Sequence, residues 1–163
     1  MSVLIDKADS GVALTIVRSL GKKGIDVTAA ASKKRALAFY SKYCKNKVVY
    51  PPPESCAERF LQKMLELVKN GNHEVLFTLG SPEMDIISRN RDRFIPHVNI
   101  PLVDHETLMK AKDKGQILKI AMENDVPCPK TYFPEKISDV ELSLIHISEP
   151  TRPRLISYAV FCL

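Results

Sequence analysis

The opening thirty residues constrain the fold of this chain more than any other stretch. The apolar run Val3–Ile5 predicts a buried strand, and the polar segment Asp6–Gly11 predicts a turn. An amphipathic helix is expected next, from apolar residues at helical spacing: Ala13, Ile16, Val17 and Leu20. Gly24 favours the end of that helix, because a left-handed residue just past a helix is least strained as glycine. The apolar segment Ile25–Ala31 predicts a second strand, so the chain begins with a parallel βαβ unit.

Strand and helix patterns continue to alternate after this unit. Lys47–Tyr50 and Glu74–Thr78 predict a third and a fourth strand. Between them, Ser55 precedes a glutamate by three residues, which is the spacing of a capping box at a helix start. After the fourth strand, Ser81 is the expected N-cap of the next helix, with a proline at the first helical position. We therefore expect residues 1–103 to form an α/β domain, a Rossmann-like three-layer sandwich with a parallel sheet.

Ligands of such sheets bind beyond the carboxyl ends of the strands, where the turns after the first and fourth strands come together. The polar and glycine residues of these two turns are the candidates for substrate binding: Asp6, Asp9, Ser10, Gly11, Gly80 and Ser81. No catalytic residue and no metal ligand is predicted. The histidines lack the H-E-x-x-H spacing of a zinc site, and the sequence contains no G-x-S-x-G motif.

Composition narrows the possible partners. Hydrophobic residues make up 45% of the chain, yet no apolar run approaches the roughly 20 residues of a membrane span. We expect a cytoplasmic protein with no membrane partner. The net charge of +5 is concentrated in part at Lys33–Arg35, but no pattern of stacking aromatic residues accompanies it, so no nucleic-acid partner is predicted. A small-molecule substrate is the expected partner, and the oligomeric state stays open.

The character of the sequence changes after residue 103. Asp104 and Asp113 each stand where an N-cap would precede a helical pattern, and the second of these helices is expected to end near Asn124. The proline-rich segment Val126–Phe133 is predicted to be an extended crossing into another domain. Residues 104–141 are thus expected to be a helical linker and the start of a second domain.

Within that region, the segment Asp113–Thr131, DKGQILKIAMENDVPCPKT, resembles the start of the ATP-grasp domain, which reads roughly D-K-x3-L-x2-A-x3-G-[IV]-P-x-P-x-T. The first hundred residues likewise resemble the Rossmann-like domain that precedes the ATP-grasp fold in carboxylate-amine ligases, biotin carboxylase and carbamoyl phosphate synthetase. The sequence departs from the pattern at Asp125, where the family usually has glycine. An aspartate in the left-handed conformation can replace that glycine.

The resemblance implies a function for the intact parent of this chain. ATP-grasp ligases activate a carboxylate as an acyl phosphate, which an amine or a similar nucleophile then attacks, and they use ATP and Mg²⁺. Lys114 aligns with the lysine or arginine that biotin carboxylase-like members place on nucleotide phosphates. A second lysine and the acidic Mg²⁺ ligands lie much later in such chains. We therefore expect this stretch alone to be inactive and to bind no cofactor.

Residues 142–163 read, codon by codon, as the translation of a transposase-type sequencing adapter. On this interpretation the authentic sequence is truncated after Glu141, before the ATP-grasp domain. His146 and Cys162 are accordingly excluded from functional reasoning.

Two other interpretations stay open. The first is an NAD(P)-binding Rossmann domain of an oxidoreductase, but the first turn has only Gly11 where G-x-G-x-x-G needs three glycines, and Ser32–Lys34 supplies no acid for a ribose hydroxyl. The second is a flavodoxin-like, non-enzymatic binding module, in which Asp6 and Asp9 would form an acidic pocket. The third strand supplies no partner acid for such a pocket, which counts against this interpretation.

Overall fold

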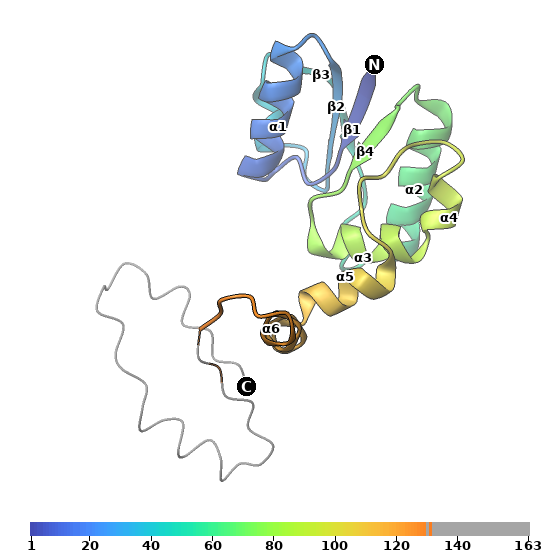
Figure 1. The fold of residues 1–163 in the computed structure, drawn as a ribbon. Coiled ribbons are helices and arrows are strands. Elements are labelled where there is room, and N and C mark those ends of the chain that lie inside the picture. The colour runs from blue at the N-terminus through green and yellow to red at the C-terminus, as the bar shows by residue number, and fades with distance from the viewer. Residues whose placement is uncertain (130, 132–163) are drawn as a thin grey trace. The chain divides into compact units, whose positions relative to one another are not determined.

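The computed structural model describes residues 1–129 and 131, so the predictions for residues 142–163 and for most of the extended crossing lie outside the described residues. The chain divides into two units, Met1–Leu108 and Met109–Leu163 (Figure 1). Among the described residues, none of the helices combines the length and the apolar character that crossing a bilayer requires.

The first unit is built on a four-stranded sheet in which every pairing is parallel (Figure 1). The strands are β1 (Ser2–Ile5), β2 (Asp26–Ala31), β3 (Cys44–Val49) and β4 (Val75–Phe77), in the order β3-β2-β1-β4. Val3 of β1 is paired with both Val27 of β2 and Val75 of β4, so β1 is a central strand of the sheet. The predicted parallel α/β architecture is confirmed.

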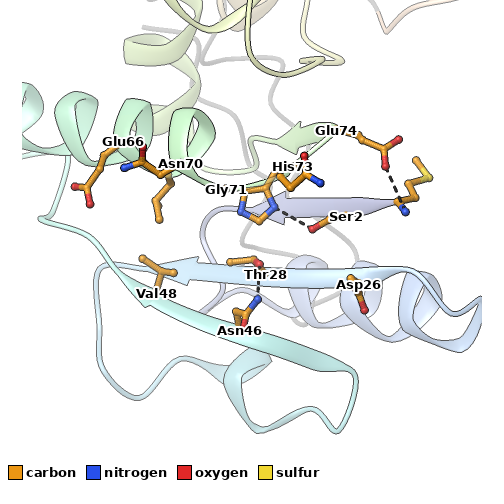
Figure 2. Close-up of a pocket in the computed structure, with 13 residues that line it drawn as sticks. Ser2, Asp26, Thr28, Asn46, Val48, Glu66, Asn70, Gly71, His73 and Glu74 are labelled. Carbon is orange, nitrogen blue, oxygen red and sulfur yellow. Dashed lines mark hydrogen bonds and ion pairs between the residues drawn. The ribbon is translucent and has the colours of Figure 1, made fainter.

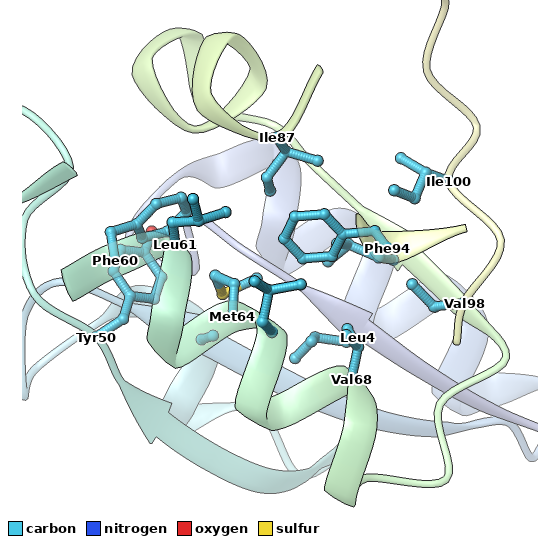
Figure 3. Close-up of a cluster of buried hydrophobic side chains, with 13 residues drawn as sticks. Leu4, Tyr50, Phe60, Leu61, Met64, Val68, Ile87, Phe94, Val98 and Ile100 are labelled. Atoms are coloured by element: carbon cyan, nitrogen blue, oxygen red, sulfur yellow. The ribbon is translucent and has the colours of Figure 1, made fainter. Parts of the chain in front are cut away.

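Helices cover both faces of this sheet, as a three-layer sandwich requires. On one face lie α1 (Gly11–Lys22) and the short 3-10 helix η1 (Leu37–Tyr40), and on the other lie α2 (Ala57–Asn70), α3 (Ser81–Arg89) and α4 (Arg91–Phe94) (Figure 1). Each face has its own buried cluster. Figure 3 shows the cluster on the α2 side, where Phe60, Met64 and Val68 of α2 pack with Leu4 and with Phe94.

Besides shifts of one residue at the ends of β1, β2 and β4, three boundaries differ from the sequence predictions for an identifiable reason. β3 begins at Cys44 instead of Lys47, because most of its side chains are exposed at the sheet edge and its lysines conceal the strand pattern. Ser55 does not cap α2, which begins at Ala57 with Cys56 as the N-cap. The N–H groups of Ser55 and Cys56 both bond to the Pro52 carbonyl, at 3.3 and 2.9 Å, so a turn after the prolines occupies the predicted capping position.

The third difference concerns α3. Gly80 is its N-cap, with an extended backbone, and Ser81 is its first residue and not its cap. The Gly80 carbonyl accepts the first helical bond, from Met84 N–H at 2.8 Å. A side chain at position 80 has no room, because a Cβ atom there would overlap Oε2 of Glu83. Packing of that glutamate therefore favours glycine at the N-cap position.

The predicted helix caps after residue 103 are confirmed. Oδ1 of Asp104 accepts from Thr107 N–H at 2.8 Å at the start of α5 (His105–Lys112). In the second unit, Oδ1 of Asp113 accepts from Gln116 N–H at 3.0 Å and caps α6 (Lys114–Glu123). The next turn contains Asp125, whose φ of 53° is the left-handed conformation predicted for an aspartate at this position.

Candidate functional site

The turns after β1 and β4 are held together at the carboxyl edge of the sheet. Asp6 N–H donates to the Phe77 carbonyl at 3.1 Å, and Oδ1 of Asp6 accepts from Leu79 N–H at 2.7 Å. Asp6 is completely buried, with an exposed fraction of 0%. Asp6 thus connects the turn after β1 to the end of β4 and to the turn that follows it. The structure therefore brings together the two turns that the sequence predicted as neighbours.

Tyr50, from a third segment of the chain, hydrogen-bonds both to the turn after β1 and to the first turn of α3. It follows β3 and is buried, with its ring in a T-shaped contact with Phe60 at a centroid distance of 5.0 Å. Its hydroxyl donates to Oε1 of Glu83 at 2.9 Å and accepts from Lys7 N–H at 3.1 Å. Lys7 has a φ of 51°, an unfavourable conformation for a residue with a side chain. The Tyr50 hydrogen bond helps to hold that strained residue in place.

Glu83 completes this buried group from the first turn of α3. Its exposed fraction is 0%, and its carboxyl group packs against Gly80. Within the described part of the chain, Oε2 of Glu83 and Oδ2 of Asp6 are buried without a hydrogen-bond partner. Such groups are costly to bury, and in native proteins they call for an explanation.

The electrostatics of the group follow from its burial. Burial raises the pKa of Asp6 to about 8 from a usual value of 3.8, the Leu79 hydrogen bond opposes that rise, and the charge of Glu83 adds to it. Burial likewise raises the pKa of the Tyr50 hydroxyl, with further contributions from the charges of Asp6 and Glu83. Burial therefore favours the protonated form of the Asp6 carboxyl and the neutral form of the phenol.

The remaining residues of the predicted site have different surroundings. Ser10 is the N-cap of α1, and its Oγ accepts from Ala13 N–H at 3.1 Å. Asp9 is partly buried beside Lys7, with its Oδ2 4.0 Å from the ammonium nitrogen. A Cβ atom at Gly11 would meet nothing within 4 Å, so open space lies over the start of α1. Ligand binding by these residues stays a prediction.

Lys114, the predicted nucleotide contact, belongs to the second unit. It is exposed and is the first residue of α6, directly after the Asp113 cap. Among residues 1–129 and 131, no group of three or more histidine, cysteine or carboxylate side chains is arranged to hold a metal ion.

A cavity of about 560 Å³ lies at the opposite, amino edge of the sheet and was not predicted (Figure 2). Its floor includes Thr28 and Asn46, whose side chains hydrogen-bond at 3.3 Å, and its wall includes His73, bonded to Ser2 at 3.0 Å. Its three carboxylates are each paired with a cation: Asp26 with Lys45, Glu66 with Lys63 and Glu74 with the N-terminal amine of Met1. The cavity therefore presents no unpaired carboxylate to a ligand.

Sequence reasoning missed Tyr50 and Glu83 as parts of the candidate site. Glu83 had a usable signal, because it is an acidic residue at the start of a helix that follows the carboxyl end of a strand. Tyr50 had none, since a tyrosine at the end of an edge strand is typical of ordinary packing.

Two solved structures resemble the chain. Glycinamide-RNase-transformylase T from Mycobacterium tuberculosis matches with a TM-score of 0.61 and 15% identity, over 90% of this chain and 39% of that chain. The biotin carboxylase domain of a single-chain bacterial carboxylase matches with a TM-score of 0.61 and 15% identity, over 89% of this chain and 34% of that chain. Neither the family models nor the curated proteins gave a match to the sequence. At this identity the likeness shows the fold alone, a Rossmann-like α/β fold.

Proposed function

We propose that residues 1–141 are the N-terminal domain and linker of an ATP-grasp ligase that activates a carboxylate as an acyl phosphate. The observation that carries this proposal is the fold match to a biotin carboxylase domain, one of the enzyme types named by the sequence resemblance. The confirmed Asp113 cap and the left-handed Asp125 support it independently, because they fit the local conformation of the ATP-grasp sequence pattern.

In this proposal the carboxyl edge of the sheet binds the small-molecule substrate. Asp9, Ser10, Gly11 and Ser81 follow β1 or β4, at the end of the sheet where ligands of doubly wound sheets bind, and would contact the substrate. Asp6 and Gly80 would support the site from the protein interior. Asp6 is buried, and Gly80 is packed against Glu83. The chain spans 39% and 34% of the lengths of the two matching structures, so the activity belongs to a longer protein.

ATP and Mg²⁺ are the proposed cofactors of that longer protein. Mg²⁺ would neutralise charge on the transferred phosphoryl group. Lys114 would contact a phosphate of ATP, since an ammonium group beside a helix start is suited to a polyanion. An exposed lysine alone gains only about 1 kcal/mol from an ion pair, so enclosure by further domains is required for binding.

Calorimetric titration with ATP and Mg²⁺ tests the proposal. The 163-residue chain should show weak or no binding, and a longer protein with its downstream sequence restored should bind ATP tightly. Lys114→Ala should weaken binding by the longer protein about tenfold, the equivalent of roughly 1.4 kcal/mol. Lys69→Ala is the matched control, because Lys69 is an exposed lysine at the other end of a helix, in the last turn of α2.

Two results would overturn the proposal. Tight, Mg²⁺-dependent binding of ATP by the 163-residue chain would show that the nucleotide site does not need the further domains. Tight binding of NADP in place of ATP by the longer protein would instead favour the oxidoreductase interpretation.

A further inference from the structure

The face of the sheet that α2 covers changes from apolar to polar toward the amino edge. Its apolar positions include Leu4, Ala30 and Val48, which pack in or against the buried cluster on that side. Successive side chains of a strand alternate between the two faces, so the residues two positions earlier lie on the same face. These residues are all polar: Ser2, Thr28 and Asn46. The cavity of about 560 Å³ lies at this polar part of the face, beside the last turns of α2 (Figure 2).

The floor of the cavity is a hydrogen-bonded pair from two neighbouring strands. Thr28 of β2 and Asn46 of β3 are partners in the register of the sheet. Nδ2 of Asn46 donates to Oγ1 of Thr28 at 3.3 Å, and the Thr28 side chain is buried, with an exposed fraction of 3%. Because the Thr28 oxygen accepts this bond, its hydroxyl proton is available for a bond to a ligand.

The wall opposite this pair is held by His73. Its Nδ1 lies 3.0 Å from Oγ of Ser2, which fixes the ring at the start of β1 (Figure 2). The edge of the ring packs against Gly71, where an added Cβ atom would lie 2.6 Å from Nε2 of His73. Glycine at position 71 therefore leaves the space that the ring occupies.

The charges around the cavity are balanced. Each of its three carboxylates is paired with a cation, at distances of 2.5 to 3.3 Å. Burial lowers the pKa of His73 below its usual value of 6.5, so the imidazole is uncharged at neutral pH. The carbonyl groups at the end of α2 carry partial negative charge and disfavour an anion. A charged ligand therefore meets no unpaired side chain of opposite charge among the described lining residues.

We propose that this cavity is a binding site for a small, uncharged polyol, such as a sugar alcohol or a monosaccharide. Its rim carries three exposed amide side chains, Asn46, Asn70 and Asn72. Amides both donate and accept hydrogen bonds, as the hydroxyl groups of a polyol do. The described lining residues include no phenylalanine, tyrosine or tryptophan, so an aromatic ligand has no ring to stack on.

The size and the position of the cavity fit this inference. Its volume lies within the range of about 300–1,000 Å³ that is typical of small-molecule sites. It is at the opposite edge of the sheet from the turns after β1 and β4. The inference therefore does not rest on the proposed function and is tested separately from it.

Nuclear magnetic resonance of the full 163-residue chain, titrated with myo-inositol and with D-glucose, tests the site. The side-chain amide resonances of Asn46, Asn70 and Asn72 should shift together and saturate with at least one of these polyols. The dissociation constant should be on the order of 1 mM, as for other small ligands with few contacts. Inorganic phosphate and ethylammonium, an anion and a cation, should give no saturable shift at these amides.

Two variants locate the binding. Thr28→Val keeps the shape of the side chain but removes the hydroxyl, and it should weaken polyol binding about tenfold. Asn46→Leu removes an amide at an exposed position of the edge strand, where folding is least affected, and should weaken binding similarly. Thr15→Val is the matched control, because the Thr15 hydroxyl bonds to the Gly11 carbonyl on α1, and it should leave binding unchanged.

Three results would overturn the proposal. The first is the absence of saturable shifts with both polyols, including shifts that only grow in proportion to concentration across the whole surface. The second is saturable binding of phosphate or ethylammonium that is tighter than binding of either polyol. The third is unchanged polyol affinity in both Thr28→Val and Asn46→Leu, which would place the bound polyol outside the cavity.

Discussion

Replacing Asp6 by asparagine should change how the stability of the protein depends on pH. The raised pKa of Asp6 means that the folded protein keeps a proton that the unfolded chain has lost between its usual pKa of 3.8 and about 8. Stability should therefore fall as pH rises through this window and level off above it, at a limit of about 1.4 kcal/mol per pH unit for one proton. The amide introduced by Asp6→Asn would keep an oxygen to accept from Leu79 N–H but would have no proton to lose.

The measurement is the free energy of unfolding in urea at a series of pH values, for the wild-type chain and for Asp6→Asn. Between about pH 5 and pH 7 the variant should gain about 3 kcal/mol relative to wild type, since the one-proton slope acts over about two pH units. Asp26→Asn, a change at an exposed carboxylate of β2, should show no such gain. A constant difference between Asp6→Asn and wild type across this range would refute the reasoning, because Asp6 would then be ionised in both states.

The remaining predictions concern other single positions. Gly80→Ala should lower the free energy of unfolding by about 1–3 kcal/mol in urea titrations, because its Cβ displaces the buried Glu83 carboxyl, whereas Gly11→Ala, with open space, should be nearly neutral. Burial lowers the pKa of His73, so stability should decline as pH falls below the ordinary value of 6.5, and His73→Gln should reduce that decline. Asp113→Ala should reduce helicity in α6, visible in carbon-13 shifts, without affecting α5.

The main features of the fold were predictable because they follow from local patterns. The spacing of apolar residues predicts the strands and helices, and capping residues predict where helices begin. The left-handed position after α1 was recognisable from Gly24, which has a φ of 76°. Errors arose where a tertiary or turn interaction overrode the local signal. Ser55 has the spacing of a capping box, but the turn fixed by Pro52 moved the helix start to Ala57. Local rules contain no information about that competition.

The candidate site was predictable only in its position. Topology alone brings the turns after β1 and β4 to one edge, and the bond between Asp6 and Leu79 confirms that they meet there. Which polar residues face outward depends on packing from α3 and from the segment after β3, neither of which adjoins Asp6 in the sequence. A polar turn is typical of a solvated loop, so local patterns could not separate the buried Asp6 from the partly buried Asp9.

The different burial of Asp6 and Asp9 changes how the effect of a mutation at the site is interpreted. Asp6 and Asp9 belong to one turn, and both are predicted ligand residues, yet Asp6 is completely buried and bonded to Leu79 N–H, whereas Asp9 is only partly buried. Loss of binding after a change at Asp6 would therefore report a displaced turn, with altered pH dependence as its signature. Loss of binding after a change at Asp9, with the pH dependence intact, would instead report a direct contact with the ligand. The pH profile therefore distinguishes a residue that supports the site from one that contacts the ligand.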